Sequence, residues 1–252
     1  AGTDGKLVLV DDDAVTVSLS AFEEDDWYAL TTSVFTENKT DLELYYSFDD
    51  VSVNGYLCDP WWGTTVASGH KANTDLHFYQ DDFDLNGIEQ AREIEFTLKI
   101  RDNEDWFADP VVEQTFIVYP FGDDVSEQEP QEFDDDAILL ADTDECTMIL
   151  TGYSQSDYYF SANVYLENKS ETDLEFQVSG STAVNGYEIN PYFYMDIPAG
   201  KKANSSINWY QGDLQENGID TVEELELEIN IQDANDWFAD PVFSDTLVVS
   251  VE

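Results

Sequence analysis

The sequence predicts an all-β protein built from two tandem antiparallel β-sandwich domains that are joined by an acidic linker. Three observations lead to this prediction. The chain of 252 residues repeats itself at an offset of about 131 positions, apolar and polar residues alternate with a period of two, and Asn, Asp and Gly clusters separate the alternating runs. With 42% hydrophobic and 14% aromatic residues, the chain has enough apolar material to form packed cores.

The internal repeat is the strongest of these signals. Segment 53–119 matches segment 184–250 at 28 of 67 gap-free positions. The longest matching block, Asp-Trp-Phe-Ala-Asp-Pro-Val, occupies 105–111 and recurs at 236–242. A repeat of this length indicates two copies of one structural domain.

The domain boundaries follow from the repeat and from the charge between the copies. We predict a first domain at 1–120 and a second at 136–252. The predicted linker is 121–135, because eight of the sixteen residues at 121–136 are acidic and none is basic. Such a segment repels itself and stays extended.

Alternation identifies the strands. Apolar residues occupy every second position in 94–100 and again in 225–231, which predicts one buried and one solvated face. A helix would scatter the apolar residues of 223–231 around its axis, so a strand is predicted there despite four glutamates. The other predicted strands of the first repeat, with equivalents in the second, are Leu7–Val10, Val15–Leu19, Trp27–Thr36, Leu42–Phe48, Leu76–Tyr79 and Val112–Val118.

Turns and short helical segments complete the predicted domain. Segments 82–88 and 213–219 are predicted as single helical turns that cross between the sheets. Three segments match the glycosylation sequon and predict surface turns: Asn38-Lys39-Thr40, Asn168-Lys169-Ser170 and Asn204-Ser205-Ser206. Short strands separated by such turns are typical of a sandwich with Greek-key connections.

Several short motifs resemble a known family. They are the Asn-Lys-Thr or Asn-Lys-Ser turn, Val-Asn-Gly-Tyr, Ala-Gly-Lys-Lys-Ala-Asn at 199–204, Asn-Gly-Ile and Asp-Trp-Phe-Ala-Asp. The pattern resembles the immunoglobulin-like, telokin-like domains of unknown function in secreted lipoproteins of Gram-positive gut bacteria, and it covers both repeats almost end to end. The first repeat departs from it at 68–71. The resemblance implies an immunoglobulin-like fold and an extracellular or cell-surface lipoprotein whose export signal precedes Ala1, and it implies no reaction.

The charge excludes two classes of partner. The 56 Asp and Glu residues against 9 Lys and Arg residues give a net charge of −47. This field repels phosphate backbones and anionic lipid head groups, so nucleic-acid binding and direct membrane insertion of the mature domains are not expected. No apolar run approaches the roughly 20 residues of a membrane-spanning helix.

Acidic loops in both repeats are candidate calcium sites. Calcium takes six to eight oxygen ligands in flexible geometry, and each loop supplies several carboxylates within eight positions. The alternative is a turn between two strands in which the aspartates cap backbone amides. The spacing differs from that of an EF-hand, and no other cofactor is predicted. The candidate ligands are Asp102, Asp105, Asp109, Asp233, Asp236 and Asp240.

Neighbouring aromatic residues are candidate ligand-binding residues. Trp61 and Trp62 in the first repeat correspond to Tyr192 and Phe193 in the second. Aromatic faces beside carboxylates can stack on sugars. Alternatively, one ring of each pair packs into the core and the other lies on the surface.

Catalytic motifs are absent from the sequence. There is no nucleophile elbow, phosphate-binding loop or His-Glu-x-x-His motif, and the only histidines are His70 and His77. Cys58 and Cys146 occupy non-equivalent positions, so each is predicted to be a small buried hydrophobe. The leading hypothesis is a non-enzymatic tandem binding or scaffold protein with a protein or glycan ligand at the cell surface. The alternatives are a carbohydrate-binding module that uses the loop aromatics and a calcium-stabilised adhesin or stalk.

Overall fold

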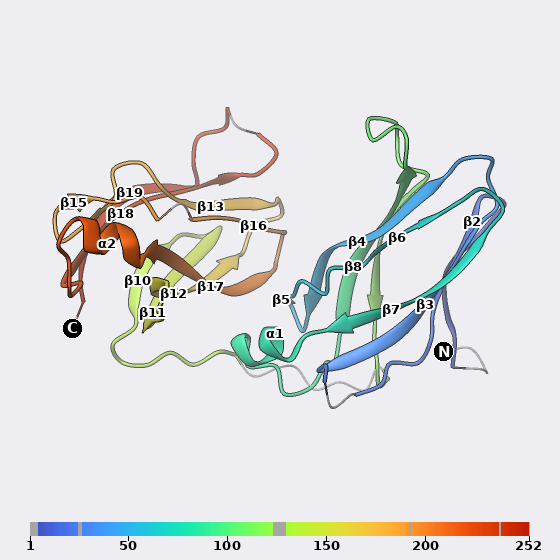
Figure 1. Cartoon of the computed structure of the whole chain (residues 1–252), viewed down its shortest axis with the longest axis horizontal. Helices are drawn as coiled ribbons and strands as arrows, with labels where there is room; N and C mark the ends of the chain where they lie inside the picture. The colour runs from blue at the N-terminus through green and yellow to red at the C-terminus, as the bar shows by residue number, and fades with distance from the viewer. Residues whose placement is uncertain (1–4, 25–26, 123–129, 192, 237, 252) are drawn as a thin grey trace. The chain divides into compact units, whose positions relative to one another are not determined.

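The computed structural model describes residues 5–24, 27–122, 130–191, 193–236 and 238–251. The chain divides into two compact units, Ala1–Glu129 and Pro130–Glu252. Nearly all regular structure in the described ranges is antiparallel β-sheet, with one six-residue helix in each unit, which confirms the all-β prediction (Figure 1). Each described helix has six residues, which is too short for a membrane-spanning helix. The middle of the predicted linker, 123–129, lies outside the described residues.

The first unit contains two antiparallel sheets. Its elements are β1 (Leu7–Asp11), β2 (Val15–Leu19), β3 (Leu30–Asn38), β4 (Leu44–Val53), β5 (Tyr56–Leu57), β6 (Gly63–Val66), β7 (Lys71–Phe78), α1 (Gln80–Leu85), β8 (Ile94–Asp102) and β9 (Val112–Val118). One sheet has the strand order β1-β2-β3-β7. In the other, β8 lies between β4 and β9, and the short strands β5 and β6 pair with the outer side of β4. Strands distant in sequence thus become neighbours, as the pairing of β3 with β7 shows.

The second unit repeats this arrangement. Its elements are β10 (Ile138–Asp142), β11 (Cys146–Gln155), β12 (Tyr159–Asn168), β13 (Leu174–Val178), β14 (Ala183–Val184), β15 (Tyr187–Glu188), β16 (Phe193–Ile197), β17 (Lys202–Tyr210), α2 (Gln211–Glu216), β18 (Glu224–Asp233) and β19 (Phe243–Ser250). One sheet contains β10-β11-β12-β17, and the other contains β15-β14-β18-β13-β16 with β19 on the free side of β18. The two sheets face each other as layers of a sandwich (Figure 1).

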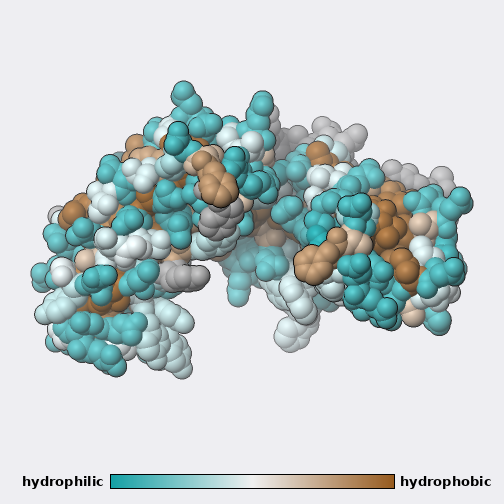
Figure 2. All heavy atoms as spheres, turned by 90° about the horizontal axis from the view of Figure 1, so that it is seen from above, coloured by the Kyte–Doolittle hydropathy of each residue, from teal (hydrophilic) through white to brown (hydrophobic). Residues whose placement is uncertain are grey.

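Alternation along the strands builds both cores. The apolar residues of β8 from Ile94 to Ile100 are at most 2% exposed, and those of β18 from Leu225 to Ile231 are 0% exposed. The polar residues between them are mostly half-buried on the outer faces. Hydrophilic residues cover most of the face seen in Figure 2, with apolar areas between them. Much of the negative charge is therefore solvated surface that discourages edge-to-edge association of strands.

Some predicted boundaries differ from the structure. The strand predicted to begin at Trp27 begins at Leu30, and the side chain of Trp27 is 86% exposed. The helices α1 and α2 begin two residues earlier than the predicted turns and bury Phe83 and Leu214. Apolar character located most of the longer strands, but it missed β5 and β6 and placed the start of β7 five residues too late. Where strand pairing starts depends on the neighbouring strand.

The prediction of surface turns at the sequons is wrong for Asn38 and Asn168, which are buried, and for the third sequon at 204–206, which lies within β17. Asn38 is 0% exposed and Asn168 is 1% exposed. In the second unit, Asn168 Nδ2 donates hydrogen bonds to the carbonyl oxygens of Thr172 and Ile197, both at 2.8 Å. Its Oδ1 accepts bonds from Ser170 N and Ser170 Oγ. A buried amide whose polar atoms are all bonded fixes the turn from inside.

The two cysteines behave as buried hydrophobes, as predicted. Both are free, with Cys58 8% and Cys146 0% exposed. Val15 is the residue of the first unit that corresponds to Cys146. Cys146 pairs with Asn168, and Val15 pairs with the equivalent Asn38. Burial, together with the nearby Asp82, raises the pKa of the Cys58 thiol to about 12. The thiolate, which is the reactive form, is therefore disfavoured at neutral pH.

Candidate functional site

The loop between β8 and β9 is held by its own aspartates. Asp102 Oδ1 accepts a hydrogen bond from the backbone amide of Glu104 at 2.9 Å, and Asp105 Oδ1 accepts one from Phe107 N at 3.1 Å. The carbonyl of Asp105 also accepts a bond from Ala108 N at 3.2 Å. These are the short side-chain-to-backbone bonds that aspartates form in turns. They give the loop a fixed backbone conformation.

The loop between β18 and β19 has the same bonds at equivalent positions. Asp233 Oδ1 accepts hydrogen bonds from Asn235 N at 2.7 Å and Asp236 N at 3.2 Å. Asp236 Oδ1 accepts a bond from Phe238 N at 3.0 Å, and the carbonyl of Asp236 accepts one from Ala239 N at 3.1 Å. Both loops extend beyond the strands that carry them (Figure 1). We call the segments 102–111 and 233–242 the aromatic loops.

Each aromatic loop exposes one phenylalanine completely. Phe107 is 100% exposed and Phe238 is 99% exposed. In the first unit, Trp106 lies against the loop base, where its ring is 5.3 Å from that of Tyr45 and 6.0 Å from the guanidinium of Arg101. Trp106 remains 51% exposed despite these contacts, and the phenylalanine that follows it is fully exposed to solvent. The corresponding Trp237 lies outside the described residues.

The predicted metal ligands are carboxylates of these loops. One oxygen of Asp102, Asp105, Asp233 and Asp236 already accepts backbone amide bonds. Asp109 and Asp240 are exposed. Within the part of the chain that the structure describes, no group of three or more His, Cys, Asp or Glu side chains converges on a point where it could hold a metal ion. The loop conformation therefore has an explanation in turn hydrogen bonds alone.

Calcium is expected to leave the thermal unfolding midpoint unchanged relative to a chelator. The capped carboxylates need no cation to fix the loop, and a ligand that binds only the native state would raise the midpoint by mass action. The measurement is calorimetry in CaCl2 and in EDTA, with MgCl2 at equal ionic strength as the control for screening of the −47 charge. A midpoint raised by calcium and not by magnesium, and lowered again in Asp236→Asn, would establish an ion site.

The predicted ligand-binding tryptophans lie in opposite environments. Trp61 is 85% exposed, whereas Trp62 is 7% exposed and packs against Phe48 with 4.4 Å between ring centroids. Trp62 Nε1 donates a hydrogen bond to Thr74 Oγ1 at 3.1 Å. Trp61 has a φ of 38°, and its backbone amide donates to Asp59 Oδ1 at 3.1 Å. Of this pair, only Trp61 offers a ring face to a ligand.

In the second unit, Phe193 is a core residue of β16 and is 7% exposed. Tyr192 lies outside the described residues. The next residue, Tyr194, is 50% exposed, and its hydroxyl donates to Asp196 Oδ2 at 3.2 Å. The structure thus brings together Trp61 and Asp59 in the first unit, and it places Trp62 and Phe193 in the two cores.

The histidines make local structural contacts. His77 Nδ1 is 3.0 Å from Thr31 Oγ1, and its ring stacks on Tyr28 at 4.0 Å. His70 Nδ1 is 2.7 Å from the carbonyl oxygen of Ser68. In these contacts His77 meets a threonine hydroxyl and a tyrosine ring, His70 meets a backbone carbonyl, and neither ring meets a carboxylate.

Sequence reasoning missed a cavity in the second unit. It has a volume of about 650 Å³ and lies between β10, β11 and the end of β19. One signal could have pointed to it: Gly152 interrupts the alternating pattern of β11, and a glycine inside a strand often marks a bulge.

A comparison of the chain with protein-family models finds no model that matches, and a comparison with curated proteins finds no match either.

Proposed function

We propose that the chain is a non-enzymatic binding protein of the cell surface, in which two immunoglobulin-like domains on an acidic linker each offer the same loop to a partner. One observation carries the proposal. Phe107 and Phe238, which are 131 positions apart, are almost fully exposed at the same place in two loops with the same hydrogen bonds. The partner is a protein or glycan, and the cell-surface location follows from the resemblance to secreted lipoproteins.

An exposed phenylalanine forgoes the roughly 1.5–3 kcal/mol that burying its side chain would contribute. Single exposed apolar residues are common, so one such ring would support no function. Here the exposure recurs in both units, and Asp105 and Asp236 fix the backbone amides of the two phenylalanines. A ring on a preorganised backbone suits insertion into an apolar pocket, because less conformational freedom is lost on binding.

The charge of the aromatic loop indicates what kind of pocket on the partner would accept its phenylalanine. The first aromatic loop carries Asp102, Glu104, Asp105 and Asp109 around its phenylalanine, and its sequence at 102–111 contains no basic residue. A pocket with an apolar floor and a rim of lysines or arginines complements this arrangement. Two such contacts on one chain bind a multivalent partner more tightly than either contact alone.

The number of binding sites per chain tests the proposal. Peptides are selected from a random phage-displayed library on the immobilised full chain, and the stoichiometry of a synthetic winner is measured by calorimetry. We expect selected peptides to combine apolar residues with Lys or Arg. Two peptides should bind the unmodified chain, one should bind Phe107→Ala or Phe238→Ala, and none should bind the double variant.

Trp61→Ala is the matched control, since it removes a ring that is 85% exposed from another loop. It should leave the stoichiometry at two. Peptide binding that survives in the double phenylalanine variant would overturn the proposal. Cleavage of the peptide during the titration, seen by mass spectrometry, would contradict the non-enzymatic part of it.

Carbohydrate binding is the second candidate, favoured by Trp61. Its ring is 85% exposed beside Asp59, so a sugar could stack on the indole while the carboxylate accepts a hydroxyl proton. A neutral oligosaccharide on a glycan array that binds the chain and not Trp61→Ala would support this function. An array without a bound glycan would count against it.

A further inference from the structure

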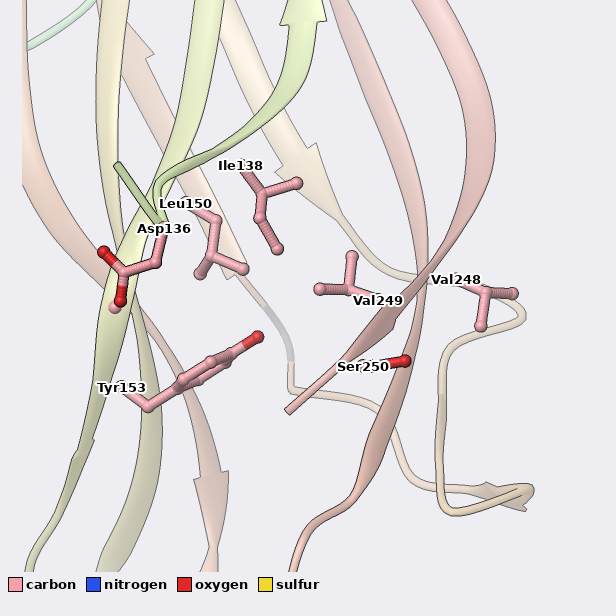
Figure 3. A pocket seen from close by; sticks show the side chains of 8 residues that line it. Asp136, Ile138, Leu150, Tyr153, Val248, Val249 and Ser250 are labelled. Atoms are coloured by element: carbon pink, nitrogen blue, oxygen red, sulfur yellow. The ribbon is translucent and has the colours of Figure 1, made fainter. Parts of the chain in front are cut away.

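The cavity of the second unit opens at the edge of the sandwich, between the two sheets. Its apolar wall consists of Ile138 on β10, Leu150 on β11, and Val248 and Val249 on β19. Leu150 and Val249 are 2% and 5% exposed and form the floor, whereas Ile138 and Val248 are 37% and 62% exposed at the mouth. Figure 3 shows Ile138, Leu150, Tyr153 and Val249 around one space, with Val248 on the other side of β19. Its volume of about 650 Å³ is within the range of small-molecule sites.

A bulge turns Tyr153 into this space. Leu150 pairs with Val164 and Gly152 pairs with Asn163, so Thr151 is an extra residue in β11. Without the bulge, Tyr153 would face outward, because residues of a strand alternate between faces. With it, Tyr153 pairs with Ala162, which is 0% exposed and faces the core. Gly152 accommodates the bend with a φ of 148°.

The Tyr153 hydroxyl is the one polar side-chain atom at the cavity that is both buried and unpaired. The ring packs against Phe160 with 5.8 Å between centroids, and the oxygen points toward Val249 and Ser250 (Figure 3). This oxygen is inaccessible to solvent and has no hydrogen-bond partner within the described residues. Burial also raises the pKa of Tyr153, so the phenol stays protonated and can donate. Buried hydroxyls are normally bonded, so this one is a donor without an acceptor, and a ligand in the cavity reaches it once the side chains that cover it shift slightly.

The first unit lacks this donor. The offset of 131 that aligns Asp11 with Asp142 places Ala21 at the position of Gly152 and Phe22 at that of Tyr153. Accordingly, β2 ends at Leu19, whereas β11 continues to Gln155. The glycine and the hydroxyl therefore belong to the second unit alone among the described residues. The bulge does not, because the first unit also has one extra residue between the Leu19–Val34 pair and the Glu23–Thr31 bridge.

We propose that this cavity binds a small uncharged apolar molecule whose single oxygen accepts a hydrogen bond from Tyr153. The aliphatic wall takes the apolar body of the ligand, and the phenol orients its oxygen. Anions are rejected, because Asp136 lies at the cavity and the whole chain carries a charge of −47. The site is independent of the aromatic loops.

Three probes of similar shape test the site: acetophenone, which has a carbonyl acceptor, ethylbenzene, which has none, and benzoate, which is an anion. Methyl NMR spectra of the full chain report binding. Acetophenone should shift the methyl signals of Leu150 and Val249 and saturate at about 1 mM or below. Ethylbenzene should bind more weakly, and benzoate should leave the spectra unchanged.

Variants separate the hydrogen bond from the cavity. Tyr153→Phe should weaken acetophenone binding about fivefold and leave ethylbenzene binding unchanged, since one neutral hydrogen bond is removed. Tyr158→Phe removes an exposed hydroxyl and should change neither. Ile138→Trp, at the partly exposed mouth, should abolish binding of both, whereas Leu7→Trp on β1 of the first unit should not.

Methyl spectra that do not respond to acetophenone would overturn the proposal and mean that the cavity holds water only. An equal loss of acetophenone and ethylbenzene affinity in Tyr153→Phe would also overturn it, because the phenol would then contribute shape and no hydrogen bond.

Discussion

Replacement of Asn168 by alanine is expected to lower the free energy of unfolding of the second unit by about 3 kcal/mol. The side chain is 1% exposed and makes four hydrogen bonds. Alanine would remove the buried donor to the carbonyl oxygen of Ile197, whereas the carbonyl oxygen of Thr172 keeps a bond from Ser170 Oγ. Asn38→Ala should have the same effect on the first unit, because Asn38 Nδ2 donates to the carbonyls of Leu42 and Val66 at 2.8 and 2.9 Å.

Native-state hydrogen exchange measures the loss in each unit separately, through the amides of β12 for Asn168→Ala and of β3 for Asn38→Ala. Asn235→Ala, in an exposed loop, is the control and should change protection by less than about 0.5 kcal/mol. Unchanged protection in both buried variants would mean that water replaces the amide, and the turn would then be held by its backbone alone.

Replacement of Trp209 by alanine is expected to cost about 4 kcal/mol, the largest effect of a single substitution in the second unit. Trp209 is 1% exposed, and its Nε1 donates to the carbonyl oxygen of Ile189 at 3.1 Å. Alanine would leave a cavity the size of an indole. Trp209→Phe should cost about 1–2 kcal/mol, because the same carbonyl keeps a bond from Thr182 Oγ1 and the equivalent position of the first unit holds Phe78.

Chemical denaturation followed by far-ultraviolet circular dichroism compares the free energies of unfolding of Trp209→Ala and Trp209→Phe. Trp61→Ala, which removes an exposed side chain, is the control. Equal unfolding midpoints for Trp209→Ala and Trp61→Ala would contradict the packing described for this core.

The sequence predicted the parts of the fold that follow from local pattern. The buried residues of β8 and β18 appear in the alternation of apolar residues, and the aspartates of the aromatic loops appear in the repeat. Burial of Asn38 and Asn168 could not be predicted, since it depends on carbonyl groups about 28 positions away that the folded chain brings near. An Asn-Lys-Thr segment looks like an exposed turn when only its neighbours are considered.

The candidate sites also depend on contacts between residues that are distant in the sequence, which the local pattern does not predict. The pair Trp61 and Trp62 was recognised as aromatic, but which ring is exposed depends on packing against Phe48 and Thr74. Phe107 was visible within a repeated block, but its complete exposure was not. Tyr153 was missed because its direction depends on one bulged residue, and a shift of one residue moves every following side chain to the other face.

The exchange of tryptophan and phenylalanine between the two cores has a practical consequence. The first unit buries Trp62 and Phe78, and the second buries Phe193 and Trp209 at the corresponding positions. Each core therefore carries an indole that the other core replaces by a phenyl ring. In a variant that keeps only Trp62 or only Trp209, with the other five tryptophans replaced, the fluorescence would report the unfolding of one unit, without any external label.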